Sequence, residues 1–226
     1  MRRLLFLLII GLGGASVLTG LGVWQMQRLA WKQGMLAEIE ARIAADPVAL
    51  PADPDPLRDA YLPVTVTGPL GVETIRVLVS RKQVGAGYRI IRVMDHPEGP
   101  ILIDQGFVPV EQEVTGVGQA PVTVIGNLQW PQETDSYTPA PDTGRNIWFA
   151  RDVEALAEAL GTRPVLVVQR EVSDPDFSVA PMPVDTTAIP NDHLQYAITW
   201  FSLAAIWLAM TIAFLRRPRA ANKRVD

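Results

Sequence analysis

Hydrophobic side chains are concentrated in two uncharged runs at opposite ends of the chain, Leu4 to Val23 and Tyr196 to Leu215. Each run is 20 residues long, which as a helix spans about 30 Å, the thickness of the hydrocarbon core of a bilayer. The pattern predicts one transmembrane helix over residues 1–24 and another over residues 196–215. A buried core helix is the alternative for the second run.

A cleavable signal peptide is the alternative for the first run, with Arg2 and Arg3 as its basic region. The hydrophobic region of such a peptide is about 7–15 residues long, which is shorter than this run. Ala15-Ser16-Val17 is a poor cleavage site, and apolar sequence continues beyond it. We therefore expect an uncleaved anchor.

Small residues form two stripes along the first run at helical spacing. They are Gly11, Ala15 and Thr19 on one stripe, and Gly13, Ser16 and Gly20 on its neighbour. Small side chains let a second helix approach closely in a membrane, and the expected partner is the second hydrophobic run. The alternative is that glycine is simply frequent in membrane helices.

Strong helix formers continue from the first run to about Ala45, where Asp46-Pro47 predicts the end of the helix. Residues 25–59 are thus expected to form a helical stalk followed by a linker rich in Pro and Asp. A second such stretch predicts a return linker over residues 173–195, ahead of the second run.

Residues 60–172 are expected to form the folded domain. Six segments rich in Val, Ile and Thr predict strands there: Leu62–Thr67, Thr74–Ser80, Tyr88–Met94, Ile101–Val108, Val122–Leu128 and Pro164–Arg170. Residues 95–99 have the composition of a hairpin turn. One helix is predicted at Val153–Leu160, capped by Asp152 and ended by Gly161. The order of elements indicates an α+β domain with a mostly antiparallel sheet and one or two helices.

Basic residues at both ends of the chain predict its orientation. Arg2 and Arg3 precede the first run, and the tail 216–226 carries five basic residues against one aspartate. The two ends contribute +2 and +4 to a net charge of −4, so the stretch between the runs carries −10. Basic flanks stay in the cytoplasm, so both termini are expected there, although Arg28 and Lys32 lie beyond the first run. The acidic central domain is expected in a bacterial periplasm or the equivalent compartment of an organelle, with no affinity for nucleic acid.

Several function classes lack their sequence motifs. Phosphate loops, dinucleotide fingerprints, metalloprotease helices and nucleophile elbows are all absent from the sequence. The chain contains no cysteine, which excludes disulfides and thiolate metal sites. Any histidine chemistry must use His96, in a predicted turn and expected to be an ordinary solvated side chain, or His193.

His193 stands at the mouth of the second run. On a continuous helix His193, Tyr196, Trp200 and Trp207 fall at i, i+3, i+7 and i+14, which is one face. An imidazole above aromatic rings at a membrane surface is suited to ligate haem iron. The alternative is an interfacial belt, because aromatic and polar residues favour that depth in any case.

Several segments resemble the Surfeit locus protein 1 family. They are Leu21–Gln25 with Arg28 and Lys32, Gly87-Tyr88, Asp104–Pro109, Ile147–Asp152, and Asn191–Phe201 with its histidine. In the third segment the family usually shows an arginine before the glycine and a tryptophan after it, where this chain has Gln105 and Phe107.

The resemblance implies a bacterial assembly factor for cytochrome c oxidase that binds haem a at the inner membrane, and not an enzyme. It implies His193 as the axial ligand of the haem iron. The other expected binding residues are Tyr196, Trp200 and Trp24 against the ring, and Arg28 or Lys32 at the propionates.

The implied partners are oxidase subunit I, which would receive the haem, a haem a synthase, and membrane lipid. The alternative from another class is a scaffold that stabilises an early subunit I intermediate without binding haem, through the small-residue stripes and the two Pro-rich linkers. A two-span sensor is a weaker interpretation, because the expected cytoplasmic tails are too short for an output domain.

Overall fold

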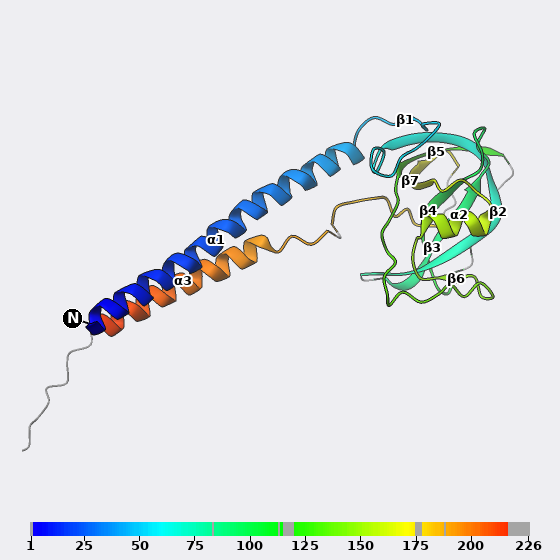
Figure 1. Ribbon diagram of the computed structural model, residues 1–226. Coiled ribbons are helices and arrows are strands. Elements are labelled where there is room, and N and C mark those ends of the chain that lie inside the picture. The colour runs from blue at the N-terminus through cyan, green and yellow to red at the C-terminus, as the bar shows by residue number, and fades with distance from the viewer. Residues whose placement is uncertain are drawn as a thin grey trace, which may run out of the picture. The chain divides into compact units, whose positions relative to one another are not determined.

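The computed structural model describes residues 2–82, 84–112, 114, 120–174, 178–187 and 189–216. The chain divides into two compact units, one made of Met1–Glu38 with Thr187–Asp226 and the other of Ile39–Thr186. The first unit contains most of helix α1 (Arg2–Ile43) and all of helix α3 (His193–Arg216). The second contains a β-sheet and helix α2 (Val153–Leu160) (Figure 1).

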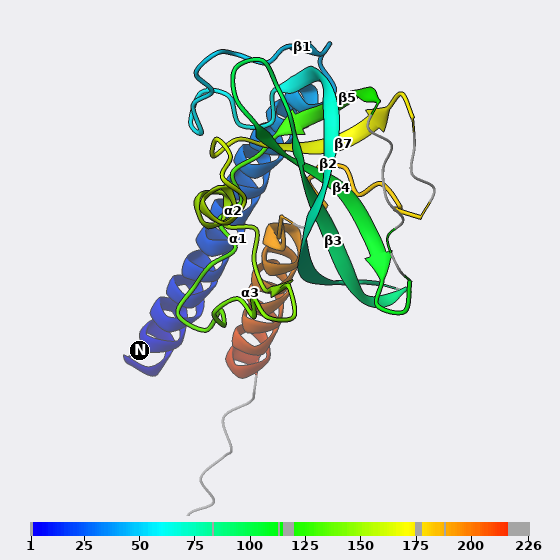
Figure 2. The same cartoon turned by 90° about the vertical axis from the view of Figure 1, so that its right-hand side faces the viewer.

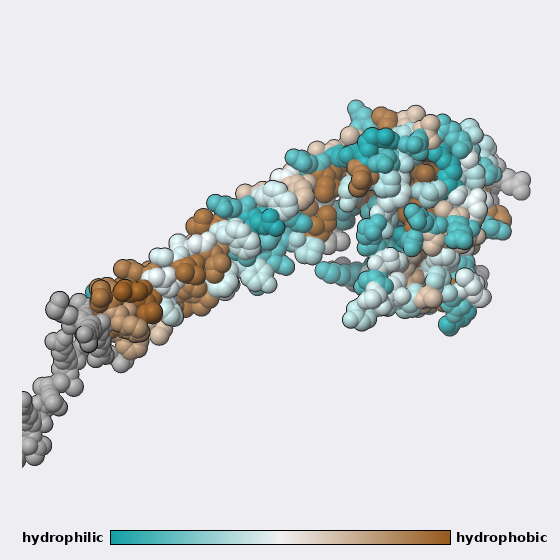
Figure 3. All heavy atoms as spheres, viewed as in Figure 1, coloured by the Kyte–Doolittle hydropathy of each residue, from teal (hydrophilic) through white to brown (hydrophobic). Residues whose placement is uncertain are grey.

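Helices α1 and α3 are both long and apolar enough to cross a membrane. Their large hydrophobic side chains point outward: Ile9 is 61% exposed and Ile206 is 56% exposed. A core helix of a soluble protein would bury such side chains. Hydrophobic residues gather over one end of the helix pair, and polar ones over the end where α3 begins (Figure 3). The two predicted hydrophobic helices are thus confirmed as candidate membrane spans.

The two helices pack against each other through positions that alternate four and three residues apart. The buried or half-buried positions of this face are Gly11, Ala15, Leu18, Gly22, Gln25 and Leu29 on α1, and His193, Ala197, Trp200, Ala204, Thr211 and Leu215 on α3. On α1 the steps average 3.6 residues, the repeat of an α-helix, which keeps the contact on one side of the helix over many turns. Gly11 near the start of α1 contacts Thr211 near the end of α3, and Gln25 further along α1 contacts His193 at the start of α3. The two helices are therefore antiparallel.

Glycines on α1 accommodate large rings from α3. A Cβ atom at Gly14 would lie 2.6 Å from the indole of Trp207, and one at Gly22 would lie 2.6 Å from the ring of Phe201. The Trp207 indole also donates a hydrogen bond to the Ile10 carbonyl at 3.3 Å. The close approach of the helices therefore depends on glycine at these positions, because glycine has no side chain.

The predicted partner of the small residues is correct, but the predicted stripes are partly wrong. Gly11 and Ala15 face α3, whereas Thr19 is exposed, and a Cβ atom added at Gly13 or Gly20 would meet no described atom within 4 Å. Steps of four residues advance 400° around a helix. They drift off the contact face, and only an alternation of fours and threes stays on it.

The sheet of the second unit closes into a barrel. Its main strands are β2 (Pro63–Arg81), β3 (Gly85–Met94), β4 (Ile101–Pro109), β5 (Pro121–Leu128) and β7 (Leu166–Val172). The order is β2-β3-β4-β7-β5, and β5 pairs again with β2. The β4–β7 pair is parallel, whereas the other four pairs of the ring are antiparallel. Short strands β1 (Val48–Ala49) and β6 (Ile147–Trp148) pair with β2. Figure 2 shows the five main strands in a turned view.

The predicted α+β class and mostly antiparallel sheet are confirmed. The segments Leu62–Thr67 and Thr74–Ser80, predicted as two strands, are one strand with a change of register between Leu70 and Thr74. The residues between them have turn composition, yet here they bend β2. Its first half can then pair with β5 and its second half with β3. Strands β1 and β6 were not predicted, because two residues carry no periodic signal.

Two hydrophobic clusters hold the barrel together. One fills the interior with side chains from all five main strands, including Val66, Ile103 and Val124. The other lies on the outer face of β4 and β7, where Leu156 of α2 belongs to the same cluster as Leu102 of β4 and Leu166 of β7. Strand β4 is therefore buried on both faces along nearly its whole length, and its buried positions include the polar Asp104 and Gln105 as well as apolar residues.

Helix α2 has the predicted bounds and both predicted caps. The Asp152 carboxylate accepts a hydrogen bond from the Ala155 amide, and Gly161 takes the left-handed conformation with φ 64°. The β3–β4 hairpin is also confirmed, with its turn closed by a hydrogen bond from the Gly99 amide to the His96 carbonyl at 2.9 Å.

The compact barrel unit extends beyond the expected range 60–172 at both ends. Leu50 from the first linker joins the barrel core. Ala180 from the return linker exchanges two hydrogen bonds of 2.8 Å with Phe107 of β4. Leu50 thus joins the first linker to the sheet through an apolar contact, and Ala180 joins the return linker to it through backbone hydrogen bonds.

The antiparallel helix pair predicts a specific cross-link. A Cβ built at Gly11 lies 3.1 Å from the Cβ of Thr211, close to the separation of about 3.5–4.5 Å in disulfides. In this cysteine-free chain, the double variant Gly11→Cys/Thr211→Cys should form an intramolecular disulfide under mild oxidation in detergent. The pair Gly13→Cys/Thr211→Cys is the matched control. Equal cross-linking of both pairs, measured by gel mobility, would contradict the packing face.

Candidate functional site

The strongest polar contact of the helix pair joins Gln25 of α1 to His193 of α3. The His193 Nδ1 atom lies 2.8 Å from the Gln25 Oε1 atom. Gln25 is buried, with 9% of its surface exposed, and His193 is half-buried. Both residues occupy the alternating contact face, which brings together two positions 168 residues apart in sequence. Among the described residues, the His193 ring makes this hydrogen bond through Nδ1 and makes none through Nε2.

Aromatic residues surround this contact on both helices. Trp24 is 50% exposed, Tyr196 is 55% exposed, and Trp200 is half-buried on the contact face. Trp207 is far from this contact, because it lies 14 residues along α3 from His193, or about 21 Å. The predicted aromatic face is therefore divided. Trp200 and Trp207 turn toward α1, whereas Tyr196 remains exposed.

Two cations lie on α1 beyond Gln25. The Arg28 guanidinium stacks over the Trp31 ring at 4.6 Å from its centroid. Lys32 is half-buried and stands seven residues beyond Gln25 on the same helix face, which is about 10 Å along the axis. Both cations thus lie within about two helical turns of Gln25 along α1.

The described residues contain no group of three or more His, Asp or Glu side chains that could hold a metal ion. A single imidazole flanked by aromatic rings is the donor set of a macrocycle-bound iron, which brings four nitrogen ligands of its own and needs only an axial one. A haem would need one nitrogen from the protein, and the imidazole of His193 is a donor of that kind in this part of the helix pair.

His96 lies in the β3–β4 turn of the barrel unit. Its Nδ1 atom accepts a hydrogen bond from the Glu98 amide at 3.3 Å. The ring thus belongs to the local turn and not to the helix pair, which leaves His193 as the one histidine of the helix unit.

Two segments that carry the family resemblance contact each other in the barrel. A Cβ at Gly87 would clash with the Phe107 ring, so Phe107 packs directly on the backbone of the neighbouring strand. Gly106 has φ 124°, a conformation that favours glycine. A Cβ there would also collide with the Ala180 carbonyl. These glycines therefore serve close packing within the barrel.

An ionic network is buried near the middle of β4. Asp104 is fully buried, and its Oδ2 atom accepts hydrogen bonds from Arg89 at 2.6 Å and Arg151 at 3.3 Å. Arg89 also donates to the Met182 carbonyl of the return linker at 2.9 Å. Arg151 is further paired with Glu133. The network joins the barrel, the segment before α2 and the return linker, and nothing in the sequence pattern indicated it.

Glu133 and Arg151 stabilise each other's charged forms. Burial alone would raise the pKa of Glu133, but the hydrogen bonds and charge of Arg151 outweigh burial and hold this pKa below its usual value. Burial alone would lower the pKa of Arg151, and the hydrogen bonds and charges of Glu133 and Asp104 instead raise it. Both groups are therefore charged at neutral pH.

Gln105, at a position where the resemblance leads one to expect arginine, has a defined partner. Its Oε1 atom accepts a hydrogen bond of 2.7 Å from Arg92, and both side chains are buried. A neutral acceptor at this position satisfies part of the Arg92 guanidinium without adding a second buried positive charge.

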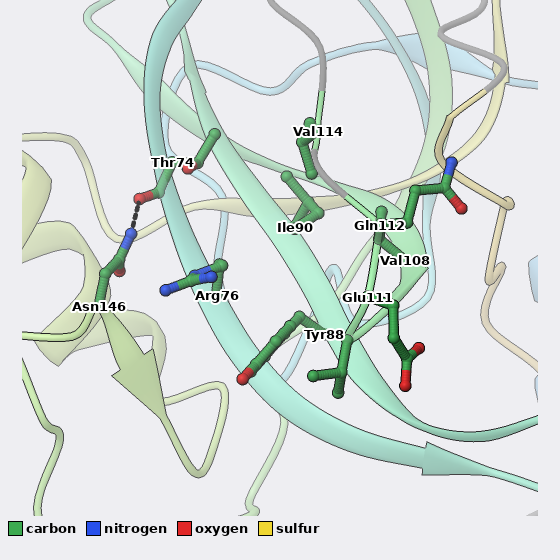
Figure 4. A pocket seen from close by; sticks show the side chains of 10 residues that line it. Thr74, Arg76, Tyr88, Ile90, Val108, Glu111, Gln112, Val114 and Asn146 are labelled. Carbon is green, nitrogen blue, oxygen red and sulfur yellow. Dashed lines mark hydrogen bonds between the residues drawn. The ribbon is translucent and has the colours of Figure 1, made fainter.

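A cleft of about 550 Å³ opens on the barrel beside Tyr88 (Figure 4). The Arg76 guanidinium stacks over the Tyr88 ring and donates a hydrogen bond to the Arg145 carbonyl at 2.6 Å. Asn146 likewise donates to the Thr74 carbonyl at 2.6 Å. The described lining contains neither histidine nor cysteine. The described lining of the cleft therefore offers no imidazole or thiolate to a metal ion.

The architecture defines the class of protein: a closed β-barrel inserted in the sequence between two apolar helices that are candidate membrane spans. A sequence model of the SURF1 family matches residues 13–205, and the chain belongs to this family of cytochrome c oxidase assembly factors. The match covers every segment on which the resemblance was based, so the predicted family is confirmed.

Three eukaryotic proteins are among the relatives of this chain. Surfeit locus protein 1 of Homo sapiens is 33% identical over 215 residues, which covers 82% of this chain and 70% of the human protein. A SURF1-like protein of Monosiga brevicollis is 31% identical over 219 residues, covering 88% and 83%. A SURF1-like protein of Drosophila melanogaster is 31% identical over 213 residues, covering 82% and 70%.

The Asp104 network predicts a large loss of stability on substitution. Asp104→Ala would leave two buried arginines without their shared carboxylate, which should lower the free energy of unfolding by about 3–5 kcal/mol. Glu171→Ala, which removes an exposed partner of Arg170, should cost less than about 1 kcal/mol. Denaturant titration of the purified chain measures both. Equal losses in the two variants would show that the network does not hold the barrel together.

Proposed function

We propose that this chain binds haem a at the membrane and aids its insertion into subunit I of cytochrome c oxidase. The observation that carries the proposal is His193, a single imidazole with one ring nitrogen free, at the mouth of an apolar helix pair. Haem a is the cargo, and its hydrophobic ring and tail are soluble at that depth. Family membership supplies the oxidase as the destination.

The residues around His193 would hold the macrocycle in a defined way. His193 would supply the axial nitrogen, while Tyr196, Trp200 and Trp24 would contact the ring. Arg28 or Lys32 would pair with the propionates, since a cation near the interface suits a carboxylate. The bound iron is only carried, and the chemistry of oxygen belongs to the oxidase.

Transfer requires that the oxidase bind haem a more tightly than this chain does. One histidine ligand beside half-exposed aromatic residues fits that requirement, because each added ligand or buried contact would slow release. Oxidase subunit I is therefore the proposed acceptor, a haem a synthase the proposed donor, and membrane lipid the surrounding medium.

The proposed location is a bacterial inner membrane with both termini in the cytoplasm and the barrel in the periplasm. Support comes from the net charge of −10 between the hydrophobic runs and the basic residues at both ends. The tail from residue 217 onward, which contributes most of that charge at the C-terminal end, lies outside the described residues. In this arrangement α1 is an uncleaved anchor.

The alternative function is a scaffold that stabilises a subunit I intermediate without binding haem. Part of the small-residue surface needed for it is already used by α3, since Gly11, Gly14 and Gly22 are covered. Gly13 and Gly20 are still open on α1 among the described residues. The visible absorption spectrum distinguishes the two functions. Only a haem-binding chain purified from cells that make haem a would show a Soret band.

The haem proposal predicts the effect of removing His193. His193→Ala should lower the bound haem a at least about tenfold, because the bond to iron is lost. Protein yield should stay similar, since the side chain lies outside the barrel core. The haem-to-protein ratio by absorption is the measurement.

His96→Ala is the matched control and should leave the haem content unchanged. A His193→Ala protein that carries haem a with an unshifted spectrum would contradict the ligand assignment and favour the scaffold.

A further inference from the structure

Gln25 is a polar residue buried on an otherwise apolar contact face. Its neighbours on that face of α1 are Gly22 and Leu29, both buried. A buried amide in a helix pair costs free energy unless it is hydrogen-bonded, and such residues typically fix the register of the two helices. Here the described structure pairs the amide oxygen with one atom, the Nδ1 of His193 at 2.8 Å.

The chemistry of this pair determines where the imidazole proton lies. An amide oxygen has lone pairs and no proton, so it can only accept. The Nδ1 atom of His193 must therefore carry the proton and donate it. A neutral imidazole has one proton, so Nε2 is left with its lone pair.

We propose that Gln25 is a positioning residue for the iron ligand: it holds His193 in the tautomer, and in the orientation, that presents Nε2 for coordination. The proposal deepens the haem-binding function and rests on it. Histidines that ligate metals usually donate their other ring N–H to a fixed acceptor, which orients the ring and raises its basicity. Gln25 meets this requirement from the opposite helix.

The proposal separates Gln25 from a merely structural residue. Gln25→Leu keeps the size and suits the apolar contact face, so the helix pair should stay intact or become more stable. It removes the acceptor, however, and haem a affinity should fall about 10–100-fold. Gln25→Glu keeps an acceptor oxygen within reach of Nδ1 and should retain affinity near that of the original chain.

The first measurement needs no haem. The full chain is labelled with ¹⁵N-histidine and purified without haem in detergent, in a His96→Ala background so that only His193 reports. The ¹⁵N shifts should show a protonated Nδ1 and an unprotonated Nε2, and Gln25→Leu should shift protons to Nε2. A protonated Nε2 in the original chain would overturn the proposal, even if every Gln25 variant failed to fold.

The second measurement is haem a titration of the original chain, Gln25→Leu and Gln25→Glu, with thermal unfolding of each. Loss of affinity in Gln25→Leu alone, at unchanged melting temperature, supports the proposal. Equal affinity of Gln25→Leu and the original chain overturns it and leaves Gln25 as a packing residue. Absence of haem binding by the original chain would instead refute the proposed function, and the histidine shifts would still report whether Gln25 sets the tautomer.

Discussion

The contact between two apolar helices from opposite ends of the chain is the constraint on which the candidate site depends. Neither helix alone buries Gln25 or orients His193. Their hydrogen bond exists because glycines such as Gly14 and Gly22 let the helices approach to ring-on-backbone distance. In a bilayer, lipid competes for apolar side chains, so close packing and the hydrogen bonds between the helices must hold the pair together. The orientation of His193 is thus a product of helix pairing.

The barrel unit differs from the helix pair. The motif residues that it contains are explained by their contribution to the packing and stability of the barrel. Phe107 packs on Gly87, and Asp152 caps α2. Asp104 and Arg151 lie in a buried ionic network that also ties down the return linker. Some of the segments that carry the family resemblance lie on the two helices, and these bring exposed aromatic residues close to an imidazole nitrogen without a hydrogen bond. The other segments form part of the barrel.

Sequence patterns predicted the parts of this structure that depend on local chemistry. Helix α2 was predicted with both caps, since capping needs only Asp152 and Gly161 and the residues beside them. Long-range features were missed. The continuous β2 strand depends on barrel closure, and the Asp104 network depends on residues brought together from distant segments. Gln25 belonged to a recognised motif but was not predicted as a site residue, although an isolated polar side chain on a contact face of alternating fours and threes was the available signal.

The central claim is that His193 bonds directly to the iron of haem a. Hyperfine spectroscopy tests it on the full chain loaded with haem a and labelled with ¹⁵N-histidine. The chain has two histidines, so a His96→Ala background leaves His193 as the one labelled imidazole. If His193 is the ligand, ferric iron should couple strongly to one labelled nitrogen. A haem-loaded protein whose iron shows no coupling to labelled nitrogen would contradict it.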